Sequence, residues 1–305
     1  MNENERLGTQ RLYALFERYP AVATDSRRAG EGTIFFALRG DRFDGNRFAL
    51  AALDAGAACA VVDDPAVAAS AGEAYAGRIV TVDDALAALQ ALACEHRRRL
   101  GIPLLAIVGS NGKTTTKELV SRVLAEKYAV YATQGNLNNH IGVPLTLLAM
   151  TRDTELGVVE MGASACGEIA LLCAIAEPNF GLITNVGRAH LEGFGGVEGV
   201  RRGKGELYDY LAANGCRVHV GGLTWQALYY MDAHTLKGPP AHRAAYRIVQ
   251  QAVGRIQKEM VDILRAAGFR TLPPLSQLKA EAAGLAPLNV TVADGWLIAA
   301  EAAGW

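Results

Sequence analysis

The segment GSNGKTTT at residues 109–116 constrains the fold of this chain more than any other stretch of it. It directly follows the apolar run 103–108, which is typical of a buried strand, and it combines glycines with a lysine and threonines. A strand that ends in a glycine-rich turn and continues as a helix presents backbone N–H groups that bind anionic oxygens. We therefore expect a strand, a phosphate-binding loop and a helix that begins near Lys113.

The residue types in this loop fit the binding of a nucleoside triphosphate. Gly109 and Gly112 allow a tight turn, the Lys113 ammonium would reach the β- and γ-phosphates, and the Thr114 hydroxyl would face Mg²⁺. The standard P-loop has a further glycine where this chain has Ile107, so the loop is a shortened variant. The alternative is a glycine-rich helix start with a solvated lysine, and the order of strand, loop and helix favours the phosphate loop.

Strand-like and helix-like segments alternate on both sides of the loop, which predicts an α/β fold. The expected strands are residues 33–38, 58–62, 78–82, 104–108, 128–132, 156–161 and 180–184. The expected helices are 46–57, 83–99, a segment from about 113, 142–148, 167–176 and 198–213. The strands after residue 103 are apolar throughout, as in a parallel sheet that is covered on both faces. Gly101 and Pro103 mark a boundary between a small α/β domain (residues 1–100) and a P-loop ATPase domain with a parallel sheet (residues 101–218).

The composition excludes several classes of protein. Lys and Arg total 30 against 31 for Asp and Glu, so no electrostatic signature of nucleic acid or of an anionic membrane is present. No apolar stretch reaches the roughly 18 residues of a spanning helix, and the polar N-terminus is not a secretory signal. Five cysteines without a CxxC pair indicate reduced thiols and a cytoplasmic chain.

Two further polar residues follow predicted strands of the second domain. Glu160 ends the strand at 156–161, and His190 follows the strand at 180–184. Taken alone, Glu160 could cap a helix and His190 could be a packed core histidine. Because ligands bind at the carboxyl ends of parallel strands, their position beside a phosphate loop favours metal and phosphate binding.

Four segments together carry a resemblance to a known family: GSNGKTTTKE, GNLNNHIGVPLTLL, EMGASACGEI and ITNVGRAHLEGFG followed by GKGELY. In this order they resemble the Mur ligase family, over about residues 20–218. Within it they are similar to the branch that adds a D-alanyl-D-alanine dipeptide to a UDP-linked muramoyl tripeptide. Residues 24–57 resemble the domain that recognises the uridine nucleotide in that branch.

The resemblance implies a role for individual residues. The nucleotide-binding set is Gly109, Ser110, Asn111, Gly112, Lys113, Thr114, Thr115, Asn138 and Asn139. The magnesium set is Thr114, Glu160, His190 and Lys204, the catalytic set is Lys113, His190 and Lys204, and the set for the UDP-linked substrate is Asp25, Ser26, Arg27 and Asp44. The implied cofactors are ATP and two Mg²⁺ ions. Lys204 matches the family lysine that reacts with CO₂ to form a carbamate, although the sequence alone favours a surface lysine.

The chemistry that the resemblance implies has two steps. ATP phosphorylates the tripeptide carboxylate, and the amine of D-Ala-D-Ala then displaces phosphate from the acyl phosphate. The expected partners are UDP-N-acetylmuramoyl-tripeptide and D-Ala-D-Ala, without nucleic acid or a membrane span, and the expected state is a monomer.

Residues 219–305 depart from the family. They contain a helix candidate at 241–267 and a hairpin candidate at 289–300, but not the YNANP-like segment of the family's third domain. This tail is either foreign sequence or an alternative domain. The rival functions are therefore a truncated or chimeric protein that binds UDP-substrate or ATP without joining them and, less favoured, a phosphotransferase built on the tail.

Overall fold

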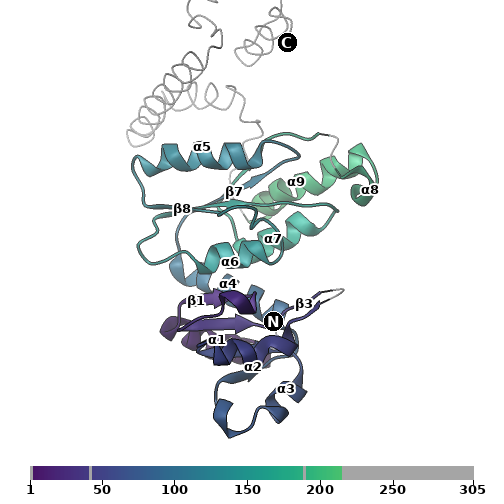
Figure 1. The fold of residues 1–305 in the computed structure, drawn as a ribbon. Helices are drawn as coiled ribbons and strands as arrows, with labels where there is room; N and C mark the ends of the chain where they lie inside the picture. Colours follow the sequence, from purple (N-terminus) through teal and green to yellow (C-terminus); the bar gives the residue numbers. More distant parts are fainter. Residues whose placement is uncertain (1–2, 41–42, 188–189, 215–305) are drawn as a thin grey trace, which may run out of the picture. The chain divides into compact units, whose positions relative to one another are not determined.

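The computed structural model describes residues 3–40, 43–187 and 190–214. The helix and hairpin predicted within residues 219–305 lie outside the described residues. The described part contains two four-stranded sheets, each with all strands parallel, and a two-stranded antiparallel ribbon (Figure 1). The predicted α/β fold is therefore confirmed.

The first sheet has the strand order β1-β2-β5-β6 and is covered by helices on both faces. Its strands are β1 (Ala21–Ala23), β2 (Thr33–Phe36), β5 (Cys59–Val62) and β6 (Ile79–Thr81). In β2, Ile34 and Phe36 pack into a cluster with α1 (Glu3–Arg18) and α4 (Ala85–Leu100), while Phe35 packs with α2 (Ala49–Asp54). Successive side chains of a strand point to opposite faces, and both sides of β2 are buried because helices cover each face.

Short elements complete this region. They are the 3₁₀ turns η1 (Ser26–Arg28), η2 (Gly45–Phe48) and η3 (Glu73–Tyr75), the ribbon strands β3 (Arg39–Gly40) and β4 (Phe43–Asp44), and α3 (Pro65–Ser70). The predicted helix at 46–57 is thus divided between η2 and α2. In α3, the Asp64 carboxylate accepts a hydrogen bond from the Ala66 N–H, and Pro65 opens the helix where its missing N–H is not needed.

Helix α4 begins and ends where its sequence indicates. The Asp84 carboxylate accepts a hydrogen bond from the Ala87 N–H at 2.8 Å, and Gly101 ends the helix in the left-handed conformation with φ 63°. The helix contacts α1, α6 and α7. Its buried Arg97 donates hydrogen bonds to the Ala176 carbonyl at 2.9 Å and to Asn179 Oδ1 at 2.9 Å.

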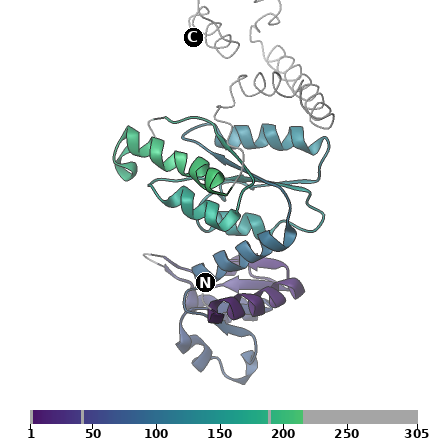
Figure 2. The same cartoon turned by 180° about the vertical axis from the view of Figure 1, so that it is seen from behind.

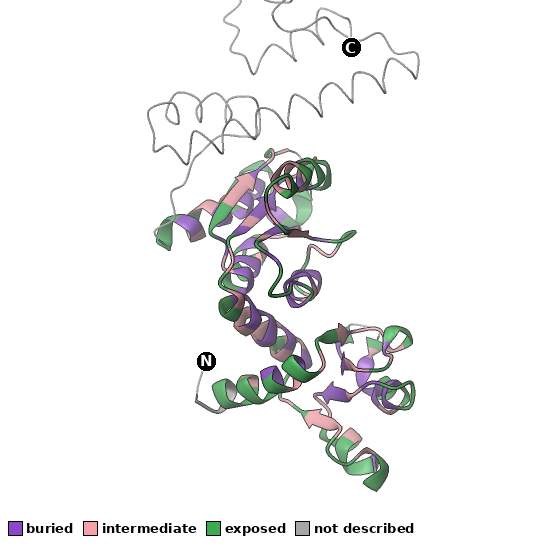
Figure 3. Cartoon of the chain, turned by 90° about the vertical axis from the view of Figure 1, so that its left-hand side faces the viewer, coloured by how far each residue is buried: buried purple, intermediate pink, exposed green. Residues whose placement is uncertain are grey.

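The second sheet has the strand order β10-β7-β9-β8. Its strands are β7 (Leu104–Val108), β8 (Val130–Ala132), β9 (Leu156–Glu160) and β10 (Phe180–Ile183), and its helices are α5 (Lys113–Ala125), α6 (Gly142–Leu148), α7 (Glu168–Ala176), α8 (Leu191–Phe194) and α9 (Val197–Ala213). Helix α5 lies on one face, and α6, α7 and α9 lie on the other (Figures 1 and 2). Buried residues gather in the strands and on the inward faces of the helices (Figure 3).

The order of these strands positions the site. Strand β7 lies between β9 and β10, and the chain first runs from β7 to β8 on one side of it and later crosses to β10 on its other side. The carboxyl end of β7 is therefore a topological switch point, where ligands of open α/β sheets bind. On β10, a Cβ at Gly181 would lie 2.6 Å from Leu211 Cδ1, so the glycine allows α9 to approach the sheet closely.

Helix α1 forms where no helix is predicted, whereas α6 coincides with the predicted segment at 142–148. In α1, Leu12 and Phe16 are buried one turn apart, although the first half of the helix is polar. In α6, Pro144 lies in the first turn, where a proline costs no helical hydrogen bond. The domain boundary near residue 101 stays a prediction, since one hydrophobic cluster contains both Ile34 of the first sheet and Leu104 of the second.

Candidate nucleotide site

The phosphate loop follows β7 directly and leads into α5. At Gly109 the backbone has φ 152°, and a Cβ there would lie 1.9 Å from Thr184 Oγ1. Gly112 has φ 75°, in the left-handed region that favours glycine. Helix α5 then begins at Lys113 with its N-terminal N–H groups at the end of the loop.

The loop is held by the segment that follows β10. The Ser110 N–H donates to the Asn185 carbonyl at 3.2 Å, and the Asn111 N–H donates to Asn185 Oδ1 at 3.1 Å. The Thr184 hydroxyl donates to the Asn111 carbonyl at 2.6 Å, and the Gly187 N–H donates to Ser110 Oγ at 3.0 Å. Only His190 of this segment is predicted from the sequence; Thr184 and Asn185, two polar residues at a strand end, are the signal that could have indicated these contacts.

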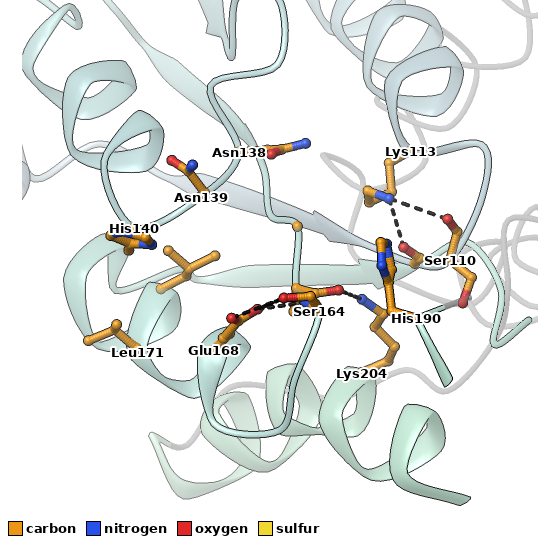
Figure 4. A pocket seen from close by; sticks show the side chains of 14 residues that line it. Ser110, Lys113, Asn138, Asn139, His140, Ser164, Glu168, Leu171, His190 and Lys204 are labelled. Carbon is orange, nitrogen blue, oxygen red and sulfur yellow. Dashed lines mark hydrogen bonds between the residues drawn. The ribbon is translucent and has the colours of Figure 1, made fainter. Parts of the chain in front are cut away.

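A pocket of about 370 Å³ opens beside the loop, within the size range of small-molecule sites. The predicted residues that line it are Gly109, Ser110, Lys113, Asn138, Asn139, His190 and Lys204. Lys113, Ser110 and His190 lie at one end of it, and His140 and Leu171 lie at the other (Figure 4). Lys113 Nζ donates to the Gly109 carbonyl at 2.9 Å, which holds the ammonium group over the loop.

Glu160 ends β9 with a side chain that is almost inaccessible to solvent, since the residue is 2% exposed. Its carboxylate accepts one hydrogen bond from the Thr114 hydroxyl at 2.9 Å and one from Asn138 Nδ2 at 2.8 Å. Both donors are side chains from other segments, so Glu160 is not a helix cap. The structure therefore joins three predicted residues: Thr114 from the first turn of α5, Asn138 from the loop before α6, and Glu160 from β9.

The groups around Glu160 fit Mg²⁺. The Glu160 carboxylate and the Thr114 hydroxyl offer oxygen atoms, which Mg²⁺ prefers. Within residues 3–40, 43–187 and 190–214, no cluster of three or more His, Cys, Asp or Glu side chains could hold a metal alone.

Lys204 lies in α9 and is buried, with 1% of the residue exposed, so the interpretation as a surface lysine is wrong. Its Nζ donates to the Ala163 carbonyl at 3.0 Å and lies 5.0 Å from the centre of the Phe194 ring. Burial, together with the nearby Lys113 ammonium, lowers the pKa of Lys204 to about 8.

His190 precedes α8 and lies on the pocket wall. It is exposed, so the interpretation as a core histidine is wrong. Its backbone has φ 53°, which is uncommon for a residue with a side chain and often marks functional sites. Helix α8 packs on α9 where glycines replace side chains: a Cβ at Gly199 would lie 1.7 Å from the Phe194 carbonyl oxygen, and one at Gly203 would lie 2.4 Å from the Phe194 ring.

Two family models match the chain. Residues 18–97 match the model described as "Mur ligase family, catalytic domain", and residues 107–229 match "Mur ligase middle domain". This chain belongs to the Mur ligase family. The resemblance carried by the sequence motifs is confirmed.

Individual relatives of this Mur ligase carry a more specific name. The UDP-N-acetylmuramoyl-tripeptide--D-alanyl-D-alanine ligase of Bacillus subtilis is 44% identical over 200 residues, which are 66% of this chain and 43% of the relative. The Escherichia coli enzyme of the same name is 37% identical over 212 residues, which are 68% of this chain and 45% of the relative. The chain thus spans less than half the length of these relatives.

The chain is also similar to solved structures of Mur ligases. MurF from Acinetobacter baumannii has a TM-score of 0.59 at 33% identity, and the match covers 67% of this chain and 46% of that one. MurF from Thermotoga maritima, determined in complex with ADP, has a TM-score of 0.57 at 36% identity, with 64% and 44% covered.

Some residues predicted for the nucleotide of this Mur ligase lie apart from the pocket. The predicted residues that do not line the pocket belong to the loop and the first turn of α5; they are Asn111, Gly112, Thr114 and Thr115. Asn139 lines the pocket, and its Oδ1 accepts hydrogen bonds from the Ile141 and Gly142 N–H groups at the start of α6. Their contact with a nucleotide stays a prediction.

The residues predicted for the UDP-linked substrate lie beside the first sheet. Asp25 caps η1, which contains Ser26, and its carboxylate forms a 2.7 Å ion pair with Arg27. Hydrogen bonds from Arg27 lower the pKa of Asp25 to about 2. Asp44 accepts hydrogen bonds from the Asn46 side-chain amide at 2.9 Å and from the Asn46 N–H at 3.0 Å, and these two bonds, the side-chain bond first, lower its pKa. None of these residues lines the pocket beside the phosphate loop, and their role stays a prediction.

Several lining residues of the Mur ligase pocket are absent from the sequence prediction. They are His140, Gly162, Ala163, Ser164, Glu168, Leu171 and Leu172. Glu168 accepts a 2.6 Å hydrogen bond from the Ser164 N–H and thereby shapes the loop between β9 and α7. An acid in the first turn of a predicted helix is the signal that could have identified it.

Proposed function

We propose that this Mur ligase chain carries the nucleotide-binding and UDP-substrate parts of an ATP-dependent ligase. The reaction would join D-Ala-D-Ala to UDP-N-acetylmuramoyl-tripeptide in peptidoglycan precursor synthesis. The convergence of Lys113, Asn138, His190 and Lys204 on one pocket beside the phosphate loop carries the proposal. The names of the relatives from Bacillus subtilis and Escherichia coli support the choice of substrates.

The proposed reaction has two steps. A tripeptide carboxylate oxygen attacks the γ-phosphorus of ATP, the bond to the β,γ-bridging oxygen breaks, and ADP leaves. The amine of D-Ala-D-Ala then attacks the acyl carbon, phosphate leaves with the former carboxylate oxygen, and the amine loses a proton. The Lys113 ammonium lies over the loop where it would offset charge on the transferred phosphoryl group.

Magnesium would supply further neutralisation of phosphate charge at this site. Thr114 and Glu160 would hold one ion, and His190 with Lys204 would hold a second. A carbamate forms when a neutral lysine amine adds to CO₂ and releases a proton. With a pKa of about 8, roughly a tenth of Lys204 is neutral at pH 7, so the burial of this lysine supports carbamate formation.

The first sheet would bind the other substrate. We assign the UDP part to Asp25, Ser26, Arg27 and Asp44, within a domain that covers residues 1–100, and the ATP to residues 101–218. The reaction would take place in the cytoplasm, where ATP is available. In the part of the chain that the structure describes, no helix has the length and apolar character needed to cross a membrane.

Nucleotide titration tests the proposal. Calorimetric binding of ADP to the full chain should weaken at least ten-fold on Lys113→Ala, because a charge-assisted hydrogen bond to phosphate is lost. The matched control is Lys127→Ala, since Lys127 is exposed and lies beyond the end of α5. Unchanged ADP affinity in Lys113→Ala would reject the phosphate-loop role.

A second assay separates a ligase from a protein that only binds its substrates. Phosphate release should require both the UDP-linked tripeptide and D-Ala-D-Ala. Binding of ADP and UDP-substrate without any phosphate release would favour the binding-only alternative.

A further inference from the structure

Lys117 is a lysine that the proposed chemistry does not use, yet it is buried, with 2% of the residue exposed. It lies in α5, one turn after Lys113 and Thr114. Its Nζ forms an ion pair with Glu118 at 2.9 Å, but the Glu118 side chain is 57% exposed. An ion pair with such an exposed partner is worth little and does not by itself explain the burial of an ammonium group.

The interior contact of Lys117 is with the residue that follows β8. Lys117 Nζ donates a 2.5 Å hydrogen bond to the carbonyl oxygen of Thr133, which is fully buried. The Thr133 hydroxyl accepts a 2.9 Å hydrogen bond from the Glu160 N–H, and the Thr133 N–H donates to the Val158 carbonyl at 3.0 Å. Thr133 thus connects α5 to the last residue of β9.

The same residue of β9 receives a second connection from the same helix. The Thr114 hydroxyl donates to one Glu160 carboxylate oxygen, and Asn138 Nδ2 donates to the other. Helix α5 therefore holds Glu160 at two points: at its carboxylate through Thr114, and at its backbone through Lys117 and Thr133. Two attachments from one helix fix both the position and the direction of the carboxylate.

We propose that Lys117 is a positioning residue, which acts through Thr133 to fix the Glu160 carboxylate for the magnesium complex of the nucleotide. The inference rests on the proposed function, because it assumes that Glu160 meets Mg²⁺. Residues that orient metal ligands typically change metal affinity by 10–100-fold when they are replaced. The effect of Lys117 should therefore appear in magnesium-dependent binding and not in nucleotide binding in general.

The test is the affinity of the full chain for ADP, measured by calorimetry with Mg²⁺ and with EDTA. In Lys117→Met and in Thr133→Val, the affinity with Mg²⁺ should fall about ten-fold or more. With EDTA, both variants should stay within about two-fold of the wild type, because the loop and Lys113 are unchanged. Thr133→Ser keeps the hydroxyl, so its affinity for ADP should increase with Mg²⁺ as much as that of the wild type.

Lys127→Met is the matched control, since it makes the same substitution at an exposed position outside the site. Thr133→Val leaves the Lys117 donor in place, so it tests the connection even if Lys117→Met does not fold. Equal losses with Mg²⁺ and with EDTA would show a purely structural role and overturn the inference, as would an unchanged gain from Mg²⁺. A wild-type chain that gains no ADP affinity from Mg²⁺ would instead overturn both this inference and the magnesium role in the proposed function.

Discussion

The packing of α8 on α9 predicts opposite effects for two substitutions of the same kind in one helix. Gly199 and Gly205 both lie in α9, and helix propensity alone predicts that alanine at either position stabilises the protein by up to about 1 kcal/mol. At Gly205 a Cβ would meet nothing within 4 Å, so this gain should be realised. At Gly199 a Cβ would lie 1.7 Å from the Phe194 carbonyl oxygen and 2.7 Å from its carbonyl carbon.

The cost at Gly199 follows from the atoms involved. A backbone carbonyl cannot rotate out of the way as a side chain can, so α8 would have to move by more than an ångström as a unit. Overpacking of this kind costs about 1–3 kcal/mol. After the gain in helix propensity is subtracted, we expect Gly199→Ala to destabilise the protein by about 1–2 kcal/mol, against a stabilisation of about 0.5–1 kcal/mol for Gly205→Ala.

Thermal unfolding followed by circular dichroism measures the difference. For a folded unit of this size, Tm should fall by about 2–8 °C in Gly199→Ala and rise by about 1–4 °C in Gly205→Ala. Because α8 begins after His190, the first variant should also weaken ADP binding, while the second should not. If Gly199→Ala melted at or above the wild-type temperature, the reasoning that α8 is seated against the glycines of α9 would be refuted.

Three other predictions concern titratable groups. Because the pKa of Lys204 is lowered to about 8 from 10.5, its contribution to stability is fully present above pH 10.5 and is lost as pH falls through 8. The free energy of unfolding, measured by chemical denaturation, should therefore rise between pH 8 and 10.5 more steeply in the wild type than in Lys204→Met, and equal slopes would contradict this. Burial lowers the pKa of His96 below 6.5, so wild-type stability should fall as pH drops below 6.5 more than that of His96→Gln, and parallel pH curves would contradict this. Glu160→Gln keeps the shape of the side chain beside Thr114 and Asn138 but removes its charge, so ADP should bind about equally without Mg²⁺ and about ten-fold more weakly with it in calorimetry.

Local signals made the phosphate loop and most of the second sheet predictable. The apolar run before Gly109 and the polar residues after it are contiguous, so the sequence shows strand, loop and helix together. Strands β7 and β9 are buried on both faces and therefore stand out as continuous apolar runs. Helix α1 was missed because its polar first half obscures the helical pattern.

Burial of single polar residues could not be predicted in the same way. Lys117 and Lys204 look like surface lysines because helical spacing does not show which polar position faces another element. Their burial depends on Thr133 and Ala163, which are distant in sequence and belong to other segments. The motif resemblance singled out Lys204 but gave no indication of Lys117.

The hydrogen bonds between the phosphate loop and the segment after β10 join residues that are 73 to 77 positions apart. The conformation of the segment GSNGKTTT therefore depends on hydrogen bonds with Thr184, Asn185 and Gly187, which lie much later in the chain. Moving the motif into another strand–helix unit would transfer the lysine and threonine side chains without the backbone conformation of the loop. A fragment that ended before β10 would keep the recognisable sequence motif but would lose the hydrogen bonds that hold the loop in its phosphate-binding conformation.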